Sequence, residues 1–350
     1  MSFFPVELSG SSREIGLKRG QIFRDSLTSL AGDLLPCYVG EKRDEHEKIA
    51  KRMRRDLEET FPQFAEELKG VAEGSGLSEQ EVFMLDAWWE NVAYPARFPS
   101  NCTCLAFTKS NVGPIMGQTA DIGRTPYFVM VLIKPKKGYS FLSTLRVDML
   151  GAGRSVNEKG LCMGGGTVGV KDRGEGLSRP AVMRAVIQGC ANVEEAVNLL
   201  KDIRMGRSTG ENILLLDASG NAAVVEKSTT KWEVRKPKNG GICVTNHFVT
   251  NAMKDVNAIS KEGLERYSEA RFERLMHFIK TGDRIDAVKS FKEILRSHGF
   301  GGLCYHGDPW PYPASTQFAN IILPEQREML VSSPMGPPCQ SQFIRFKPFS

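Results

Sequence analysis

The pattern of the sequence changes at Pro99. Before it, residues 12–35, 45–76 and 77–92 carry apolar side chains at helical spacing, and the second of these stretches ends at Gly-Ser-Gly, which is typical of a helix end. After it, short strand-like runs separated by Gly, Asn and Lys turns continue to about Met163. Helices in one block and strands in another predict an α+β protein, because consecutive strands joined by tight turns form antiparallel sheets.

The second half of the chain continues in blocks. Residues 179–190 and 192–203 predict helices, residues 212–228 predict a β-hairpin, residues 262–297 predict helix, and residues 318–346 predict strands. The run NILLLD is apolar almost throughout, which is typical of a strand that is covered on both faces. We therefore expect antiparallel sheets layered between helices, in one compact unit without internal repeats.

Charge and hydropathy limit the kinds of partner. The net charge of +5 is spread along the chain, so we expect no nucleic-acid partner. The longest apolar run, residues 127–135, is much shorter than the ~18 apolar residues of a membrane-spanning helix. The N-terminus lacks a basic start followed by an apolar core, so we expect no signal peptide, no membrane partner and a cytoplasmic protein.

The stretch PSNCTCLAF, residues 99–107, places Cys102 and Cys104 one residue apart at the start of an apolar run. Metal ligands, packed thiols and a nucleophile are three possible interpretations. A zinc site of this kind usually needs two ligand pairs at short spacing, and the other close thiol–imidazole pair, Cys304 with His306, is far along the chain. We therefore expect no metal. Packing in a core is the interpretation for Cys162, Cys190 and Cys243.

A nucleophilic role for Cys102 has a chemical basis in its position. Its thiol could attack the carbonyl of Asn101, and hydrolysis of the resulting thioester would split the chain and leave Cys102 as a new N-terminus. A free α-amine has a pKa of about 7.7–8, so it can act as the general base for the thiol of its own residue. Such a site needs no separate imidazole, which suits a chain with five histidines and no obvious Cys–His motif.

Along nearly its whole length the chain resembles the isopenicillin N acyltransferase family of cysteine N-terminal-nucleophile (Ntn) hydrolases, also called peptidase family C45. No single motif is specific for this family, but the order and spacing of the whole set of motifs are. The motifs are REIGLKRGQ, PQFAEELKGVAEGSGLSEQEVFMLDAWWE, NCTCLAF, GQTADI, VNEKGLCMGG, NILLLDASGNAAVVEKS, VTNHF, ERYSEARFERL, and GLCYHGD followed by STQFANIILPEQREMLVSSPMGPPC.

This resemblance implies a fold and a maturation step. The fold is the Ntn-hydrolase αββα four-layer sandwich, with two stacked antiparallel sheets between helical layers, formed as a single domain over residues 1–350. Self-cleavage between Asn101 and Cys102 would give a helical segment, residues 1–101, and a catalytic segment, residues 102–350, which remain associated. The family commonly has Gly where this chain has Asn101, and Asn is the residue after Gly that best tolerates left-handed backbone conformations.

The resemblance also implies roles for the site residues. Cys102 is the nucleophile, and the side-chain amide of Asn246 would donate to the oxyanion that forms when the thiol attacks. Asp121 would accept hydrogen bonds from the Cys102 amine or its neighbours and orient them. Thr103 and His247 would hold these groups in position without contacting the substrate themselves.

We therefore expect an amidohydrolase or acyltransferase that acts on a small-molecule amide or acyl-CoA-like substrate through a Cys102 thioester, without a cofactor. Hydrolysis is the favoured reaction, because water is always present and an acceptor pocket is an additional requirement. Two other classes stay open. One is a papain-like protease using Cys102 with His247, although its local signature is missing. The other is a non-catalytic binding protein in which Asn101 prevents maturation. The sequence leaves the oligomeric state open.

Overall fold

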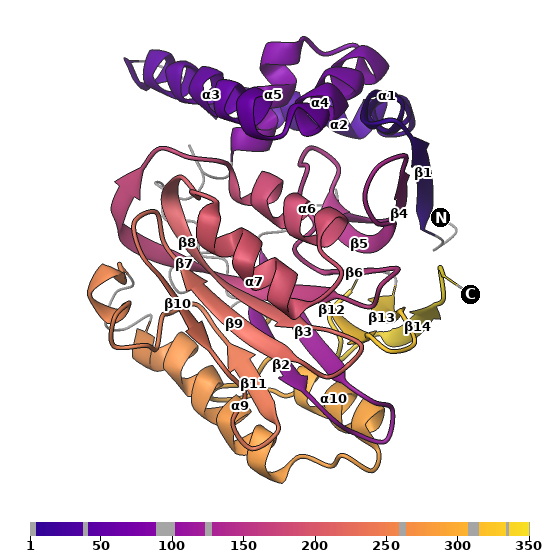
Figure 1. Ribbon diagram of the computed structural model, residues 1–350, viewed down its shortest axis with the longest axis vertical. Helices are drawn as coiled ribbons and strands as arrows, with labels where there is room; N and C mark the ends of the chain where they lie inside the picture. The colour runs from indigo at the N-terminus through magenta and orange to yellow at the C-terminus, as the bar shows by residue number, and fades with distance from the viewer. Residues whose placement is uncertain are drawn as a thin grey trace.

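The protein consists of two β-sheets with helices on their outer faces, as Figure 1 shows for the computed structural model. The structure describes residues 5–37, 41–88, 102–122, 128–258, 264–306, 315–333 and 336–349.

The larger sheet has eight strands. Their spatial order is β1 (Val6–Gly10), β4 (Phe128–Pro135), β5 (Phe141–Arg146), β6 (Ser155–Asn157), β7 (Cys162–Gly174), β8 (Arg207–Leu216), β9 (Ala222–Lys227) and β10 (Trp232–Arg235). Neighbouring strands are antiparallel, except that β1 runs parallel to β4.

The smaller sheet has six strands, and all of its pairings are antiparallel. Their spatial order is β11 (Gly241–Val244), β2 (Thr103–Phe107), β3 (Ile115–Ile122), β12 (Ser315–Leu323), β13 (Glu328–Ser333) and β14 (Gln342–Phe346).

The helices form an N-terminal group and two later pairs. The N-terminal group is α1 (Ser12–Ile22), α2 (Arg24–Leu34), a 3₁₀ turn η1 (Leu35–Cys37), α3 (Glu41–Thr60), α4 (Pro62–Ser75) and α5 (Glu79–Trp88). The later ones are α6 (Arg179–Gly189), α7 (Val193–Asp202), a 3₁₀ turn η3 (Lys254–Val256), a π-helical turn η4 (Leu264–Glu269), α9 (Ala270–Thr281) and α10 (Ala287–Leu295). Among the described helices, none is long and apolar enough to cross a membrane.

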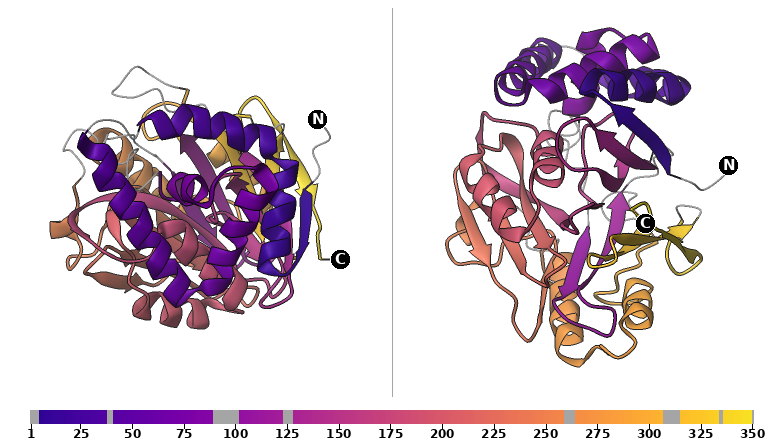
Figure 2. Two further views of the ribbon diagram at one scale, coloured as in Figure 1. Left: turned by 90° about the horizontal axis from the view of Figure 1, so that it is seen from above. Right: turned by 45° about the vertical axis from the view of Figure 1, so that its right-hand side comes forward.

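Both faces of the central strands of each sheet are buried, which produces four layers. In β8, Leu215 belongs to the apolar cluster shared with α6 and α7, whereas Leu214 packs between the two sheets. In β2, Cys104 packs between the sheets, whereas Leu105 belongs to the cluster shared with α9 and α10. The helices lie outside the two sheets in Figure 2. The predicted αββα sandwich is therefore confirmed.

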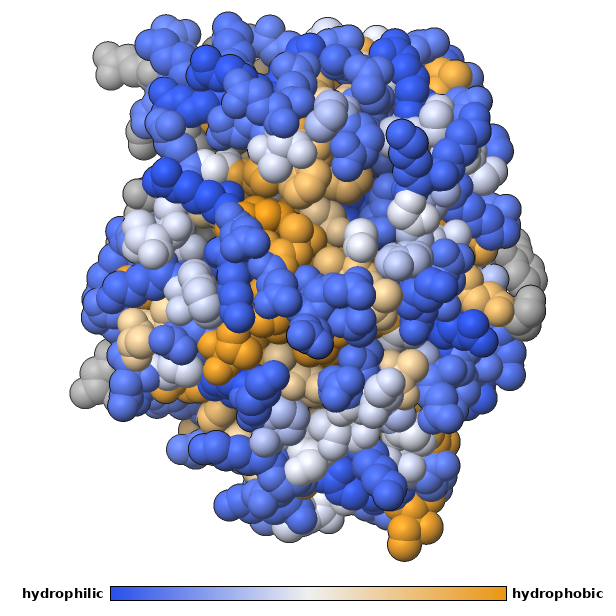
Figure 3. Space-filling model, viewed as in Figure 1, coloured by the Kyte–Doolittle hydropathy of each residue, from blue (hydrophilic) through white to orange (hydrophobic). Residues whose placement is uncertain are grey.

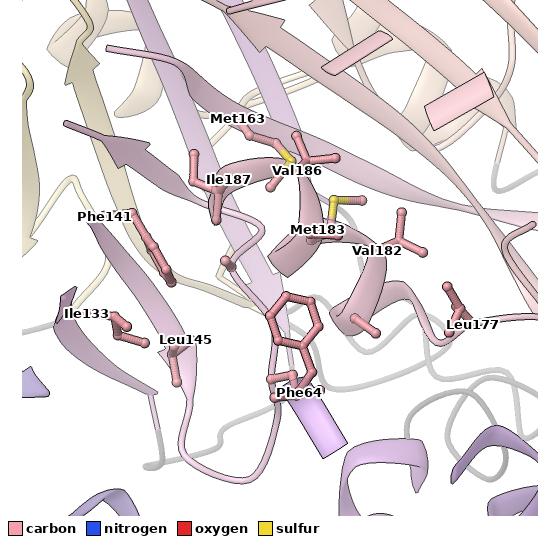
Figure 4. Close-up of a cluster of buried hydrophobic side chains, with 14 of the residues drawn as sticks. Phe64, Ile133, Phe141, Leu145, Met163, Leu177, Val182, Met183, Val186 and Ile187 are labelled. Atoms are coloured by element: carbon pink, nitrogen blue, oxygen red, sulfur yellow. The ribbon is translucent and has the colours of Figure 1, made fainter. Parts of the chain in front are cut away.

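Helices α1–α5 form a cap at one end of the larger sheet (Figure 1). Helices α1 and α4 cross at close range, because a Cβ added to Gly16 would lie 1.9 Å from Glu67 O and one added to Gly74 would lie 2.2 Å from Leu17 O. Below the cap, Phe64 of α4 reaches into the apolar cluster of the larger sheet and α6 (Figure 4). On the face drawn in Figure 3, apolar side chains gather in a band below the cap.

A buried cluster of charges joins the cap to the rest of the molecule. Glu67 of α4 pairs with Arg19 of α1 at 3.2 Å and with Arg184 of α6 at 2.8 Å, and all three side chains are almost completely buried. One carboxylate therefore lies between two guanidiniums from different layers. Breaking such a pair is costly, because the charges left behind remain out of water.

Strand β1 is the main difference from the helical N-terminal segment expected from the sequence. It pairs with β4 from Val6↔Val131 to Gly10↔Pro135, so the N-terminal segment supplies the edge strand of the larger sheet as well as the cap. A strand of five residues near the end of a chain has too short an apolar pattern to be recognised by periodicity.

We predict that Glu67→Gln lowers the free energy of unfolding by about 3–5 kcal/mol, because Arg19 and Arg184 would lose their buried counter-charge. The adjacent Glu66, whose side chain is 44% exposed and pairs with Arg13 and Lys69, is a matched control. Glu66→Gln should cost less than about 1 kcal/mol. Urea unfolding measures both variants, and equal losses would contradict the assignment.

Candidate active site around Cys102

Cys102 lies directly before β2 and is buried, with 6% of its surface exposed. Nη2 of Arg154, a residue between β5 and β6, donates a hydrogen bond of 3.1 Å to Cys102 Sγ. The larger sheet therefore brings a guanidinium to a thiol of the smaller sheet.

Several groups act on the pKa of the Cys102 thiol. Burial is the main cause, and it raises the pKa; the carboxylates of Asp121 and Glu211 raise it further. The guanidinium of Arg154 and a backbone hydrogen bond from Asp121 act in the opposite direction. The thiol is thus predominantly protonated in the folded chain, and it needs a base to become a nucleophile.

The strand register of the smaller sheet brings the predicted residues to one end. Strands β11 and β2 pair as far as Val244↔Cys104, so the turn that follows β11, with Asn246, lies near the start of β2, which Cys102 directly precedes. Strands β2 and β3 pair at Thr103↔Thr119, which places the end of β3, with Asp121, beside the start of β2.

Asp121 is completely buried and has two side-chain partners. Its Oδ1 accepts a hydrogen bond of 2.6 Å from Thr316 Oγ1, and its Oδ2 forms an ion pair with Nη1 of Arg271. Thr316 stands directly opposite Asp121 in the β12–β3 register. Burial raises the pKa of Asp121, while Arg271 and Thr316 lower it. Arg271 Nη1 also donates a hydrogen bond of 3.4 Å to Thr103 Oγ1, so Thr103 and Asp121 share Arg271 as a partner.

Two glycines in β7, Gly164 and Gly166, allow the two sheets to approach closely beside Cys102. A Cβ added to Gly164 would lie 2.5 Å from Cys104 Sγ, and one added to Gly166 would lie 2.7 Å from Thr245 O and 3.4 Å from Cys102 O. Any larger residue would push β7 away from the smaller sheet. The glycines therefore determine how near Arg154 and the other groups of the larger sheet come to the thiol.

Asn246 follows β11 and is buried. Its Nδ2 donates to Thr167 O at 2.8 Å, and its backbone N–H donates to Ser268 Oγ at 2.9 Å. Asn212 of β8 holds the same turn, because its Nδ2 donates to the carbonyls of Thr245 and His247 at 3.0 and 2.8 Å. The side-chain amide of Asn246 is thus held in the turn that follows β11.

His247 is anchored within this turn. Its Nδ1 lies 2.7 Å from Ser268 Oγ and 3.2 Å from Thr245 Oγ1, and its ring meets Phe272 edge-on at 5.6 Å. Burial lowers the pKa of His247 to about 4. Among the described residues, none of the hydrogen bonds of His247 reaches Cys102, so the site lacks the thiol–imidazole contact that a papain-like enzyme requires.

Arg271 also lines a cavity of about 470 Å³. The cavity is bounded by Tyr267 and Tyr305, by residues 298–302, and by Cys304 and His306. Because Arg271 also pairs with Asp121, the side chain of Arg271 connects the cavity to the predicted site.

The structure thus brings together Cys102, Thr103, Asp121 and Asn246, and it places His247 in the turn beside them. Asn101, the residue before the predicted cleavage point, lies outside the described residues. Sequence reasoning missed the groups that hold the site, because their roles depend on contacts between distant strands. They are Arg154, Asn212, Arg271 and Thr316.

Solved structures with similarity to this chain include two hydrolytic enzymes, and the first of them agrees with the fold. One is a variant of the conjugated bile acid hydrolase from Clostridium perfringens, which is 15% identical in sequence. The match covers 70% of this chain and 97% of the hydrolase chain, with a TM-score of 0.50. Penicillin V acylase from Agrobacterium tumefaciens is 18% identical, covers 71% of this chain and 86% of its own, and has a TM-score of 0.47. No curated protein matches the chain significantly.

A family model identifies the chain more directly. The model described as acyl-coenzyme A:6-aminopenicillanic acid acyl-transferase matches residues 107–309, which begins just after Cys102 and includes Asp121 and Asn246. This match confirms the resemblance found in the sequence. Because it spans more than half of the 350 residues, the chain belongs to the acyl-coenzyme A:6-aminopenicillanic acid acyl-transferase family.

Proposed function

We propose that this protein is a self-processing cysteine amidohydrolase or acyltransferase whose nucleophile is the thiol of Cys102. One observation supports the proposal: the turn after β11, with Asn246, and the end of β3, with Asp121, both lie near the start of β2, which Cys102 directly precedes. A thiol, an amide donor and a buried carboxylate thereby meet at one end of the smaller sheet. Family membership supports acyl chemistry at such a site.

Maturation would consist of an acyl shift followed by hydrolysis. The Cys102 thiol attacks the carbonyl carbon of Asn101, the bond from that carbon to the Cys102 nitrogen breaks, and a thioester forms. Breaking that bond frees the α-amine of Cys102, which takes the proton of the thiol. Water then cleaves the thioester, which releases a carboxylate on Asn101 and the thiol of Cys102. Residues 1–101 and 102–350 would stay associated, because β1 pairs with β4 and Glu67 pairs with Arg184 across the cleavage point.

The free amine would then serve the catalytic cycle. With a pKa of about 7.7–8, it accepts the proton of the buried thiol near neutral pH. The thiolate attacks the acyl carbon of the substrate, and Asn246 Nδ2 donates to the oxyanion of the tetrahedral intermediate. The leaving amine takes the proton, and water or another amine then removes the acyl group from the thioester. Asp121, held by Thr316 and Arg271, orients the amine.

The cavity beside Arg271 supports a small-molecule substrate. Its volume of about 470 Å³ lies within the range of small-molecule sites. Tyr267 and Tyr305 offer apolar ring surface, and Arg271 joins the wall of the cavity to Asp121. We infer that an amide or acyl-CoA-like substrate binds with its reacting carbonyl toward Cys102. Hydrolysis remains the favoured reaction, because it needs no second bound acceptor.

We predict that 4-nitrophenyl acetate acylates Cys102 and releases one rapid burst of nitrophenolate. Cys102→Ala should abolish the burst, because no thioester can form. Cys104→Ala is the matched control: Cys104 is completely buried between the sheets, and burial raises the pKa of its thiol. Stopped-flow absorbance measures the burst for each protein. Equal bursts from Cys102→Ala and the unmodified protein would contradict the assignment of the nucleophile.

We propose that His247 stabilises the turn after β11 and takes no proton from Cys102. Because the pKa of His247 is lowered to about 4 from an ordinary value near 6.5, folding favours its neutral form. Its contribution to stability is complete above about pH 6.5 and decreases as the pH falls toward 4, by about 3 kcal/mol in total.

His247→Gln should therefore remove much of the loss of stability that the native protein shows between about pH 6.5 and pH 4. Urea midpoints measured across this range report the difference. The burst with 4-nitrophenyl acetate should persist in His247→Gln at neutral pH. A variant that folds normally but has no burst would instead indicate a papain-like Cys102–His247 pair.

A further inference from the structure

Four side chains that can bind a metal lie together at the edge of the cavity that Arg271 lines, and three of them form part of its wall. The four are His298, Cys304, His306 and Cys339, and their ligand atoms all lie within 4.8 Å of one another. Three of them come from the segment between α10 and β12, and the fourth comes from the connection between β13 and β14. The sequence alone pairs only Cys304 with His306; the fold adds His298 and Cys339.

The distances in this cluster are close to those of a metal centre. His306 Nε2 lies 3.1 Å from Cys339 Sγ and 3.6 Å from Cys304 Sγ, and the rings of His298 and His306 stack at 5.1 Å. Zinc–ligand bonds of about 2.0–2.3 Å place tetrahedral ligand atoms about 3.3–3.8 Å apart. The contact between His306 and Cys304 has this spacing, the contact between His306 and Cys339 is slightly shorter, and all four ligand atoms lie within 4.8 Å of one another.

We propose that these residues form a Cys₂His₂ site for Zn²⁺. Two thiolates and two imidazoles are the ligand set that Zn²⁺ prefers, and four protein ligands leave no open position, so the site would be structural. Binding requires the thiols of Cys304 and Cys339 to lose their protons to solvent. This inference does not depend on the proposed function of Cys102.

The segments that carry the ligands are already held in place. The backbone N–H of Cys304 donates to Ser297 O at 2.9 Å. Arg296, at the end of α10, donates from Nε to Pro338 O at 2.8 Å and from Nη2 to Ser341 O at 2.9 Å. These hydrogen bonds hold both sides of Cys339 against α10. A preformed ligand set of this kind needs little reorganisation to bind a metal.

The same segment touches the partners of Asp121. Gly302 O accepts a hydrogen bond from Arg271 Nε at 3.1 Å, and Leu303 O accepts one from Thr316 Oγ1 at 3.2 Å. A metal bound at Cys304 and His306 would therefore anchor the backbone against which Arg271 and Thr316 rest. The bound metal would thereby hold in place the segment that lines the cavity.

Zinc content is the first test. Full-length protein produced with zinc and desalted under reducing conditions should hold about one zinc per chain by elemental mass spectrometry. The double variant Cys304→Ala/Cys339→Ala should hold none. Two controls should keep their zinc: Cys190→Ala, a buried thiol at the end of α6, and His277→Ala, an exposed imidazole on α9. Metal-free native protein, or equal zinc in the double variant, would overturn the proposal.

Cobalt gives a test that does not depend on folding of the double variant. Co²⁺ added alone to chelator-treated native protein should produce the visible bands of a tetrahedral ion and a thiolate charge-transfer band. His298→Ala removes an exposed ligand with little effect on the core, and it should weaken zinc binding at least about 10-fold in a competition titration. The absence of these bands, or a Cys304–Cys339 disulfide found by peptide mapping without reduction, would overturn the proposal.

Discussion

The close approach of the two sheets at β7 is the constraint on which the site depends. Gly164 and Gly166 leave no side chain between β7 and the smaller sheet, so Cys104 Sγ, Thr245 O and Cys102 O lie almost against the β7 backbone. This contact brings Arg154 of the larger sheet to the Cys102 thiol and lets Thr167 O hold the amide of Asn246. The groups that we propose as catalytic are thus positioned by the packing of one sheet against the other.

Burial then decides the electrostatics of the site. It raises the pKa of Cys102 and of Asp121, and it lowers the pKa of His247 to about 4. Within the part of the chain that the structure describes, the imidazole of His247 forms hydrogen bonds with Thr245 and Ser268 and none with the Cys102 thiol. An α-amine released at Cys102 would supply the missing base within the same residue. The N-terminal-nucleophile mechanism therefore explains how a buried thiol could act without a neighbouring histidine.

Much of the fold could be predicted because the apolar patterns are long and regular. The antiparallel blocks after Pro99 and the helices of residues 179–203 appear as the sequence indicates, whereas the five residues of β1 are too few to show a period. The side chains that contact Cys102 and Asp121 could not be predicted in this way. Arg154 and Arg271 reach Cys102 and Asp121 from elements far away in the sequence, so only strand register and packing reveal them. For the same reason, the sequence does not reveal that His298 and Cys339 lie beside Cys304 and His306.

The central claim is that Cys102 becomes an N-terminal residue, and the mass of the intact protein under denaturing conditions tests it most directly. Purified protein should give two chains, one ending at Asn101 and one whose first residue, confirmed by N-terminal sequencing, is Cys102. A single full-length mass after prolonged incubation would contradict the account. It would mean that Asn101 does not permit the cleavage on which the proposed mechanism rests.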